Sequence, residues 1–309
     1  MRELYKVLFE MAVTILVGFV LRKRRMIDER TQSTMTEILL RAVLPFTILT
    51  SSQYEYSREM LRSIFAVGGA ACAYFLCSLV VLRIVMRKLP MEEAEQRIFI
   101  SMSVFANTSF VGLPLMYSLL GNAGLLLAAI YNLVYNLFFF TYGVHLISRK
   151  RHTILEMLNN PVSIASVAAV ILFVIPWRVP LFIVDAVDIV GDMSVPLSMI
   201  LLGSSFATVD VKKLFVDYKS YLVAALRLLI FPLIMMLAIL VARTMIDISG
   251  ATMITLVLMT ALPSGTMNVM YSEKHNCAPK FCARTVVLTL ILMAATLPVM
   301  MALSIKLFM

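Results

Sequence analysis

The chain has 309 residues, of which 61% are hydrophobic and only 15% are charged, and its mean hydropathy is +0.92. Soluble domains carry about a quarter charged residues, so this composition excludes a soluble globular protein and indicates a multi-pass membrane protein. The net charge of +9 is therefore interpreted first as a topology signal, and no nucleic-acid partner is expected. The four cysteines show no C-x-x-C spacing, and no cofactor or metal is predicted.

Ten apolar runs are long enough to cross a bilayer, and the segments between them are too short to contain a soluble domain. They predict an all-α polytopic membrane protein. The ten predicted helices cover residues 4–21, 34–52, 63–86, 97–119, 123–147, 160–176, 182–206, 220–242, 251–272 and 281–306.

Basic residues alternate along the chain in a way that predicts its orientation. The loops after odd-numbered runs carry 18 Lys and Arg residues, whereas the loops after even-numbered runs carry 4. Because cytoplasmic loops are enriched in Lys and Arg, we expect the odd loops to be cytoplasmic and both termini to lie outside the cell membrane. The even loops include predicted tight turns at 121–124 and 176–180.

The sequence also repeats itself. Pro45 and Pro196, in the second and seventh runs, are 151 residues apart, and Pro114 and Pro263, in the fourth and ninth, are 149 apart. This nearly constant offset predicts two five-helix repeats, at residues 1–152 and 153–309. Each repeat has an odd number of crossings, so the two must enter the membrane from opposite sides as an inverted repeat.

The fourth and ninth runs contain features that interrupt a membrane helix. Pro114 lacks an N–H, and its ring clashes with the carbonyl of Phe110 four residues earlier, which predicts a freed carbonyl that hydrocarbon cannot satisfy. Two interrupted helices at corresponding places are typical of a transporter's binding site, and here they are expected to cross near the bilayer midplane. The N–H groups that open each second half-helix would favour an anion such as a carboxylate, and the freed carbonyls could hold a cation.

The candidate substrate-binding residues are the polar and helix-breaking residues of the fourth, fifth and ninth runs. The two asparagines of the fifth run are four residues apart and share one helix face. Interhelical hydrogen bonding is the alternative role for these two amides. The candidates are Asn107, Thr108, Ser109, Pro114, Asn132, Tyr135, Asn136, Pro263, Ser264, Thr266 and Asn268.

Two charged residues occupy equivalent places in the repeats. Arg41 and Asp192 each lie four residues before the matching prolines, Pro45 and Pro196. They are candidate vestibule or gating residues. In this role Arg41 would attract an anion from the cytoplasm. A snorkelling side chain or a structural ion pair is the alternative for each.

Several motifs resemble the auxin efflux carrier family, which belongs to the bile acid/auxin carrier superfamily of transporters. They are Ala106-Asn-Thr-Ser-Phe-Val-Gly-Leu-Pro-Leu115, Asn160-Pro161, Val195-Pro-Leu-Ser-Met-Ile-Leu-Leu-Gly-Ser204, Leu262-Pro-Ser-Gly-Thr-Met-Asn268 and Thr296-Leu-Pro298. On this resemblance, the family's crossing-point prolines correspond to Pro114 and Pro263, and its segment-four asparagine corresponds to Asn107.

The resemblance implies a secondary carrier of small organic anions, such as auxin-like or malate- and malonate-like carboxylates, working by an elevator-type alternating access. It also implies a scaffold of helices 1, 2, 6 and 7, a mobile transport domain of helices 3–5 and 8–10, and a homodimer formed through the scaffold.

A coupled symporter, an enzyme and a channel are the alternative functions. A sodium- or proton-coupled symporter of the bile acid type would need cation ligands near the crossing, and neither interrupted stretch contains Asp, Glu or His. An enzyme is disfavoured because the sequence has no His-Glu-x-x-His pattern, no P-loop and no convincing pair of intramembrane Asp residues. A channel is disfavoured because paired interrupted helices in inverted repeats favour alternating access.

Overall fold

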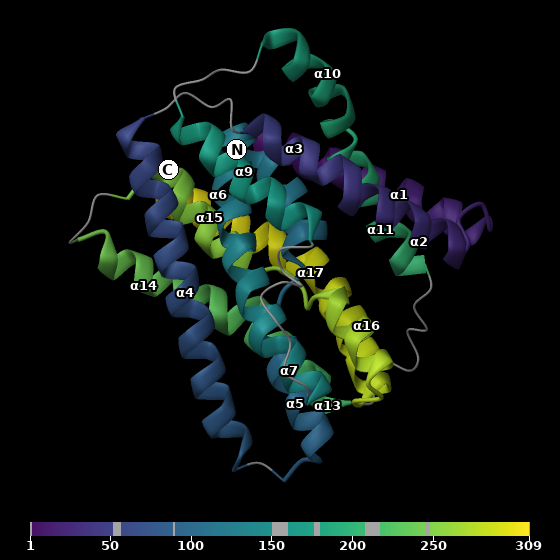
Figure 1. Ribbon diagram of the computed structural model, residues 1–309. Helices are drawn as coiled ribbons and strands as arrows, with labels where there is room; N and C mark the ends of the chain where they lie inside the picture. The colour runs from purple at the N-terminus through teal and green to yellow at the C-terminus, as the bar shows by residue number, and fades with distance from the viewer. Residues whose placement is uncertain are drawn as a thin grey trace. The chain divides into compact units, whose positions relative to one another are not determined.

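The computed structural model describes residues 2–51, 57–88, 90–149, 160–175, 180–207, 217–244 and 248–308. These residues are nearly all helical (Figure 1), and the isolated β-bridge among them joins Ala106 and Ser264. The predicted all-α class is confirmed at this level. The predicted repeat boundary at 152–153 and most of the predicted turn at 176–180 lie outside the described residues.

Within the described residues, six helical runs are long and apolar enough to cross a membrane. Two further apolar helices, α9 (Pro161–Val174) and α15 (Gly250–Thr260), are shorter than a full span. The predicted count of ten therefore stays a prediction. The six runs are Glu29–Ser51, Arg58–Met86, Thr108–Ser148, Phe182–Ala207, Tyr218–Ala242 and Pro279–Phe308.

The run Thr108–Ser148 is too long for one crossing, and its backbone shows where it is divided. Gly121 has φ 60° and ψ −150°, a conformation that only glycine adopts readily, inside what is otherwise α6 (Leu113–Phe138). This kink falls in the turn predicted between the fourth and fifth runs.

The chain divides into two compact units. Unit 1 comprises Met1–Leu61, Ser109–Leu133 and Leu158–Val209. In it α1 packs along α11, and α3 packs against α9 and α10. Gly18 and Gly203 allow α1 and α11 to approach closely, because a Cβ at either position would lie 2.0 Å or less from a backbone carbonyl oxygen of the other helix. The helices of unit 1 not yet bounded are α1 (Arg2–Lys23), α2 (Glu29–Ile38), η1 (Leu39–Val43), α3 (Leu44–Ser51), α10 (Leu181–Gly191) and α11 (Ser194–Ala207).

Unit 2 comprises Arg62–Thr108, Val134–Met157 and Asp210–Met309. Its long C-terminal helix α17 packs against α5, α13, α15 and α16. The helices of unit 2 not yet bounded are α4 (Arg58–Met86), α5 (Glu93–Val104), η3 (Phe139–Gly143), α7 (Val144–Ser148), α13 (Tyr218–Ala225), η4 (Leu226–Ile230), α14 (Phe231–Ala242), α16 (Thr266–Lys274) and α17 (Pro279–Phe308).

Three prolines inside helices follow directly after a π-helical turn. The turns η1, η2 (Thr108–Gly112) and η4 each end two residues before Pro45, Pro114 and Pro232 respectively. A wider i→i+5 turn gives room to a ring that would otherwise clash with the carbonyl four residues earlier. The interruption lies at 105–107, inside the fourth predicted run, but the expectation that Pro114 breaks the helix is wrong, because Pro114 lies buried in the first turn of α6.

Candidate functional site

The first interrupted helix breaks in the middle of unit 2's core. α5 ends at Val104, and Phe105 takes extended backbone angles (φ −94°, ψ 106°) before η2 begins. Every residue from Ile98 to Thr108 is buried. Backbone groups released here need partners within the protein, because an unpaired buried N–H or carbonyl is costly.

The second interruption lies between α15 and α16. α15 ends at Thr260 and α16 begins at Thr266, so residues 261–265 are not helical. Pro263 disfavours the helical conformation at the residue before it, which explains why the helix ends here. Gly265 has φ −71° and ψ 135° and leads the chain into α16.

The two interruptions pair with each other through their main chains. The N–H of Asn107 donates to the carbonyl of Pro263 (N···O 2.9 Å), and the N–H of Gly265 donates to the carbonyl of Phe105 (N···O 2.9 Å). The sequence predicted open main-chain groups in both stretches, but these four positions satisfy one another. These backbone groups are therefore not open to a substrate, and a substrate site here must be formed by other groups.

The carbonyls at the end of α5 and just after α15 bind a side chain that was not among the residues predicted from the sequence. Arg227, in η4, is fully buried. Its Nε donates to the carbonyl of Leu262 (2.9 Å), and its Nη1 donates to the carbonyls of Val104 (2.8 Å) and Ser103 (3.3 Å) and to the hydroxyl of Tyr74 (2.7 Å). A guanidinium thus lies where we expected the freed carbonyls to hold a cation.

The position of Arg227 agrees with the electrostatics of helix ends. The last carbonyls of a helix carry partial negative charge, so the C-terminus of α5 stabilises a cation placed against it. The Nη2 atom of Arg227 is buried and has no hydrogen-bond partner among the described residues. A single arginine inside the apolar run 220–242 was the signal in the sequence, since intramembrane charges mark functional sites.

Asn268, a predicted substrate ligand, is used to hold the paired interruptions together. Its Oδ1 accepts from the hydroxyl of Ser101 (2.6 Å), and its Nδ2 donates to the carbonyls of Gly265 (3.1 Å) and Phe105 (3.3 Å). The side chain is fully buried. In this structure both ends of the amide are therefore bound by the protein itself.

Ser264 is engaged in the same way. Its hydroxyl donates to the carbonyl of Met102 (2.9 Å), and its N–H donates to the hydroxyl of Thr289 on α17 (3.1 Å). The neighbouring candidate Thr266 differs, because it is exposed at the first position of α16. Pro263, the residue before Ser264, is buried and contributes its carbonyl to the pairing.

The candidates of the fourth run lie on either side of the division between the units. Asn107 and Thr108 are buried in unit 2. Ser109 belongs to unit 1, where its hydroxyl donates to Oδ1 of the buried Asn132 (2.9 Å). This contact between η2 and α6 is the interhelical hydrogen bond considered as the alternative role for Asn132.

The remaining candidates of the fifth run are buried in unit 2. Tyr135 stacks on Phe139 (centroids 5.6 Å apart, planes at 6°) and meets Phe105 edge-on (5.8 Å). Asn136 is fully buried beside it in sequence. Tyr135 therefore packs against the first interruption through its ring.

The two candidate vestibule residues have separate partners in unit 1. Arg41 pairs with Glu37 one helical turn away (Nη2···Oε1 2.9 Å), with both side chains more than half exposed. Asp192 accepts a hydrogen bond from the hydroxyl of Tyr117 (3.2 Å). An exposed i,i+4 pair contributes little to stability, so the Arg41 charge stays accessible to solvent or to an anion.

The fold and site define a multi-pass membrane protein whose core contains two interrupted helices joined around a buried cation. Among the described residues no cluster of His, Cys, Asp or Glu could hold a metal ion. A family model described as "Membrane transport protein" matches residues 4–157 and again residues 149–301. No individual curated protein matches the chain.

The chain belongs to this membrane transport family, which is the auxin efflux carrier family that its motifs resemble. Because the same family model matches both halves, two repeated segments are confirmed, whereas their five-helix content and inversion stay predictions. The family is one of transporters, so the chain is assigned to membrane transport.

Proposed function

We propose that the chain is a secondary carrier that moves small organic anions, such as malate-, malonate- or auxin-like carboxylates, by elevator-type alternating access. The observation that carries this proposal is Arg227, a fully buried guanidinium that no described carboxylate neutralises. Burying such a charge is costly unless something compensates it. A carboxylate near the unpartnered Nη2 would supply that compensation and would be selected over neutral or cationic solutes.

The proposed substrate site surrounds the paired interruptions. Asn107 and Thr108 are the buried polar residues proposed to contact the anion, with Tyr135 and Asn136 on the wall beside them. Asn268, Ser264 and Pro263 are proposed to keep the paired interruptions in register, and Pro114 stays a candidate of unit 1. Thr266, exposed at the start of α16, is also proposed to contact the anion. Ser109 and Asn132 stay candidate substrate residues of unit 1.

The proposed architecture is ten helices in two inverted repeats, with the fourth and ninth crossing at their interruptions. Helices 1, 2, 6 and 7 form the proposed scaffold and dimer interface, and helices 3–5 and 8–10 form the proposed mobile domain. The two compact units support this division, with the difference that residues 109–133 group with the scaffold segments. The proposed location is the cell membrane, with both termini outside.

The direct test is uptake by purified protein in vesicles. In Asn107→Ala, malonate uptake should fall about tenfold, because a buried charge-assisted hydrogen bond to the substrate is lost. The thermal unfolding midpoint should stay near that of the wild type. Asn122→Ala, which removes an amide next to the Gly121 kink, is the matched control and should transport normally.

Normal uptake by Asn107→Ala would remove that residue from the proposed site. A thermal-shift screen against mono- and dicarboxylates should also identify the preferred anion. If no carboxylate stabilises the protein or is taken up, the proposed substrate class is wrong.

The alternative is a sodium- or proton-coupled symporter. Such a carrier needs oxygen ligands for its cation, and three carbonyls that could serve, at Ser103, Val104 and Leu262, already bind Arg227. Uptake measured with sodium replaced by potassium, and at several pH values, separates this alternative from the proposal.

A further inference from the structure

A second concentration of positive charge lies in unit 2, away from the paired interruptions. A cavity of about 300 Å³ opens where α4, α5 and α7 meet. Four arginines and one carboxylate line it. The charged lining residues are Arg83, Arg87, Glu93, Arg97 and Arg149.

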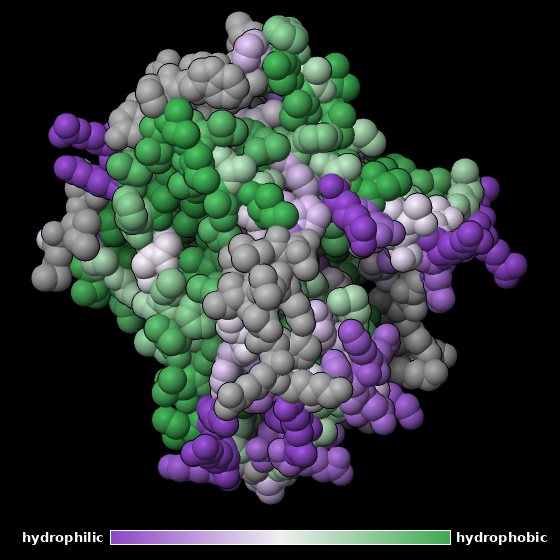
Figure 2. Space-filling view, viewed as in Figure 1, coloured by the Kyte–Doolittle hydropathy of each residue, from purple (hydrophilic) through white to green (hydrophobic). Residues whose placement is uncertain are grey.

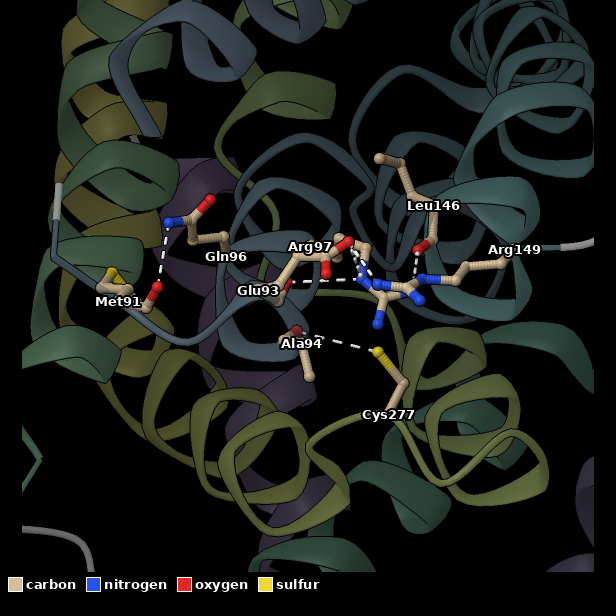
Figure 3. Close-up of polar contacts among 8 residues, drawn as sticks. All are labelled: Met91, Glu93, Ala94, Gln96, Arg97, Leu146, Arg149 and Cys277. Carbon is tan, nitrogen blue, oxygen red and sulfur yellow. Dashed lines mark hydrogen bonds and ion pairs between the residues drawn. The ribbon is translucent and has the colours of Figure 1, made fainter. Parts of the chain in front are cut away.

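The single carboxylate in this cavity is already neutralised. Glu93 forms an ion pair with Arg149 and lies 4.0 Å from Nε of Arg97 (Figure 3). The hydrogen bond and charge of Arg149 lower the pKa of Glu93, so the carboxylate stays ionised at neutral pH. Nη1 of Arg97 also donates to the carbonyl of Leu146 (3.3 Å). The five charged groups together leave the cavity with an excess of three positive charges.

Arg83, in α4, and Arg87, directly after it, differ in the partners that they have. Arg83 donates to the hydroxyl of Tyr142 and lies over its ring. The guanidinium of Arg87 makes no hydrogen bond or ion pair with any described residue, although it lines the cavity. Four guanidiniums around one cavity suit an anion with several oxygens, because their planar forks match phosphate geometry.

The surface next to these arginines suits a lipid. Leu76, Val80 and Arg83 follow one another at intervals of three or four residues and so share one face of α4, and Arg87 follows directly after the helix ends. Leu76 is 54% exposed and Val80 is 56% exposed. In Figure 2 the surface over α4 is hydrophobic along most of its length and becomes hydrophilic at the end near α5. Acyl chains could lie along this face while the headgroup reaches the cavity.

We propose that this cavity binds a phosphate group, and that the phosphate belongs to an anionic membrane lipid whose acyl chains lie over Leu76 and Val80. Loop lysines and arginines that only anchor a membrane protein project separately into solvent. Here four arginines, in or directly after α4, α5 and α7, line one cavity beside an apolar helix face. Basic cavities between membrane helices are known to bind phospholipid headgroups. The site is separate from the proposed transport path.

The test uses the purified full-length protein in detergent, with bound lipid counted by native mass spectrometry and stability followed by thermal shift. The probes are dioleoylphosphatidylglycerol, the zwitterionic dioleoylphosphatidylcholine, and soluble glycerol 1-phosphate, each in a separate arm. Phosphatidylglycerol should be retained in preference to phosphatidylcholine. Arg87→Gln should weaken phosphatidylglycerol binding about fivefold, since one partly exposed charge-assisted contact is lost.

Lys88→Gln is the matched control, because it removes the same charge from the next residue, which does not line the cavity. It should leave lipid binding unchanged. Arg87 has no described partner to lose, so its replacement is not expected to unfold the protein. Stabilisation by glycerol 1-phosphate that depends on Arg87, without lipid retention, would overturn the assignment to a lipid and assign the phosphate site to a soluble ligand.

The proposal is overturned if no phosphate-bearing probe binds. It is equally overturned if the two lipids are retained alike, or if the Arg87 and Lys88 variants lose binding to the same extent. Malonate uptake reports on the transport site independently of these measurements, so failure of one proposal does not imply failure of the other.

Discussion

At the scale of single residues, Arg227 is the side chain on which the paired interruptions depend most. It satisfies three carbonyls and one hydroxyl from α4, α5 and the stretch after α15. Without it, buried carbonyls would lose their donors, each at a cost of about 1–3 kcal/mol. It also leaves one buried Nη2 atom for a further partner. The same side chain is therefore both a structural link and the proposed counter-charge for the substrate.

These two roles of Arg227 can be separated by substitution. Arg227→Gln should lower the unfolding midpoint and abolish anion uptake, because glutamine has fewer N–H donors than arginine and carries no charge. Arg227→Lys keeps the charge but cannot supply a guanidinium fork, so it should be similarly destabilised yet retain measurable uptake. Thermal unfolding and malonate uptake measured on the same preparations check this.

Arg243→Gln provides the control for this comparison. Arg243 is exposed at the end of α14 and makes one long hydrogen bond, to the carbonyl of Leu307 (3.4 Å). Its replacement should change neither the unfolding midpoint nor the malonate uptake. Equal loss of uptake in the lysine and glutamine variants would contradict a role for the charge and leave only the structural role.

At the scale of elements, the paired interruptions need a residue without a side chain. A Cβ built on Gly265 would lie 2.9 Å from the carbonyl oxygen of Ala106 and 3.2 Å from the carbonyl of Phe105. The conformation of Gly265 is one that any residue adopts, so the requirement is steric and not conformational. The backbone bond from Gly265 to Phe105 depends on this close approach.

We therefore expect Gly265→Ala to separate the two stretches. The backbone of Ala106 must shift, which should destabilise the protein by about 1–3 kcal/mol and reduce uptake. Gly69→Ala is the matched control, because a Cβ at Gly69 meets nothing within 4 Å, and alanine favours the helix that contains it. The unfolding midpoints of the two variants provide the comparison. A Gly265→Ala variant as stable and active as Gly69→Ala would show that the close approach is not required.

At the scale of the whole molecule, two matches to one family model show that the chain was built from a duplicated half. The half-repeats bring an interrupted helix each, and these pair within one compact unit, unit 2. In that unit a guanidinium takes the place at the carbonyls where a coupling cation could bind. This gives the proposed carrier a permanent positive charge that requires no ion from solution.

Transport should consequently be independent of sodium. Replacing sodium by potassium or choline on both sides of the vesicle should leave malonate uptake unchanged within experimental error. The measurement is initial uptake rate at a fixed membrane potential, with a sodium-coupled carrier reconstituted in parallel as the positive control. A rate that falls when sodium is removed would favour the bile acid type of symporter.

The membrane class, the duplication and the two stretches where helices are interrupted could all be predicted from the sequence. These follow from local properties: apolar run length, proline spacing, and polar residues inside apolar runs. The prediction attributed the first interruption to Pro114, because the sequence does not show that a π-turn accommodates the proline ring.

The tertiary structure was needed to show which groups bind the backbone at the interruptions. Arg227 is 123 residues from Val104, and Asn268 is 167 residues from Ser101, so neither contact leaves a local pattern in the sequence. The backbone hydrogen bonds between the two interruptions also join segments that are far apart in the sequence. Hydrogen bonds between distant segments depend on how the helices pack, and buried polar groups must find partners wherever that packing brings them together.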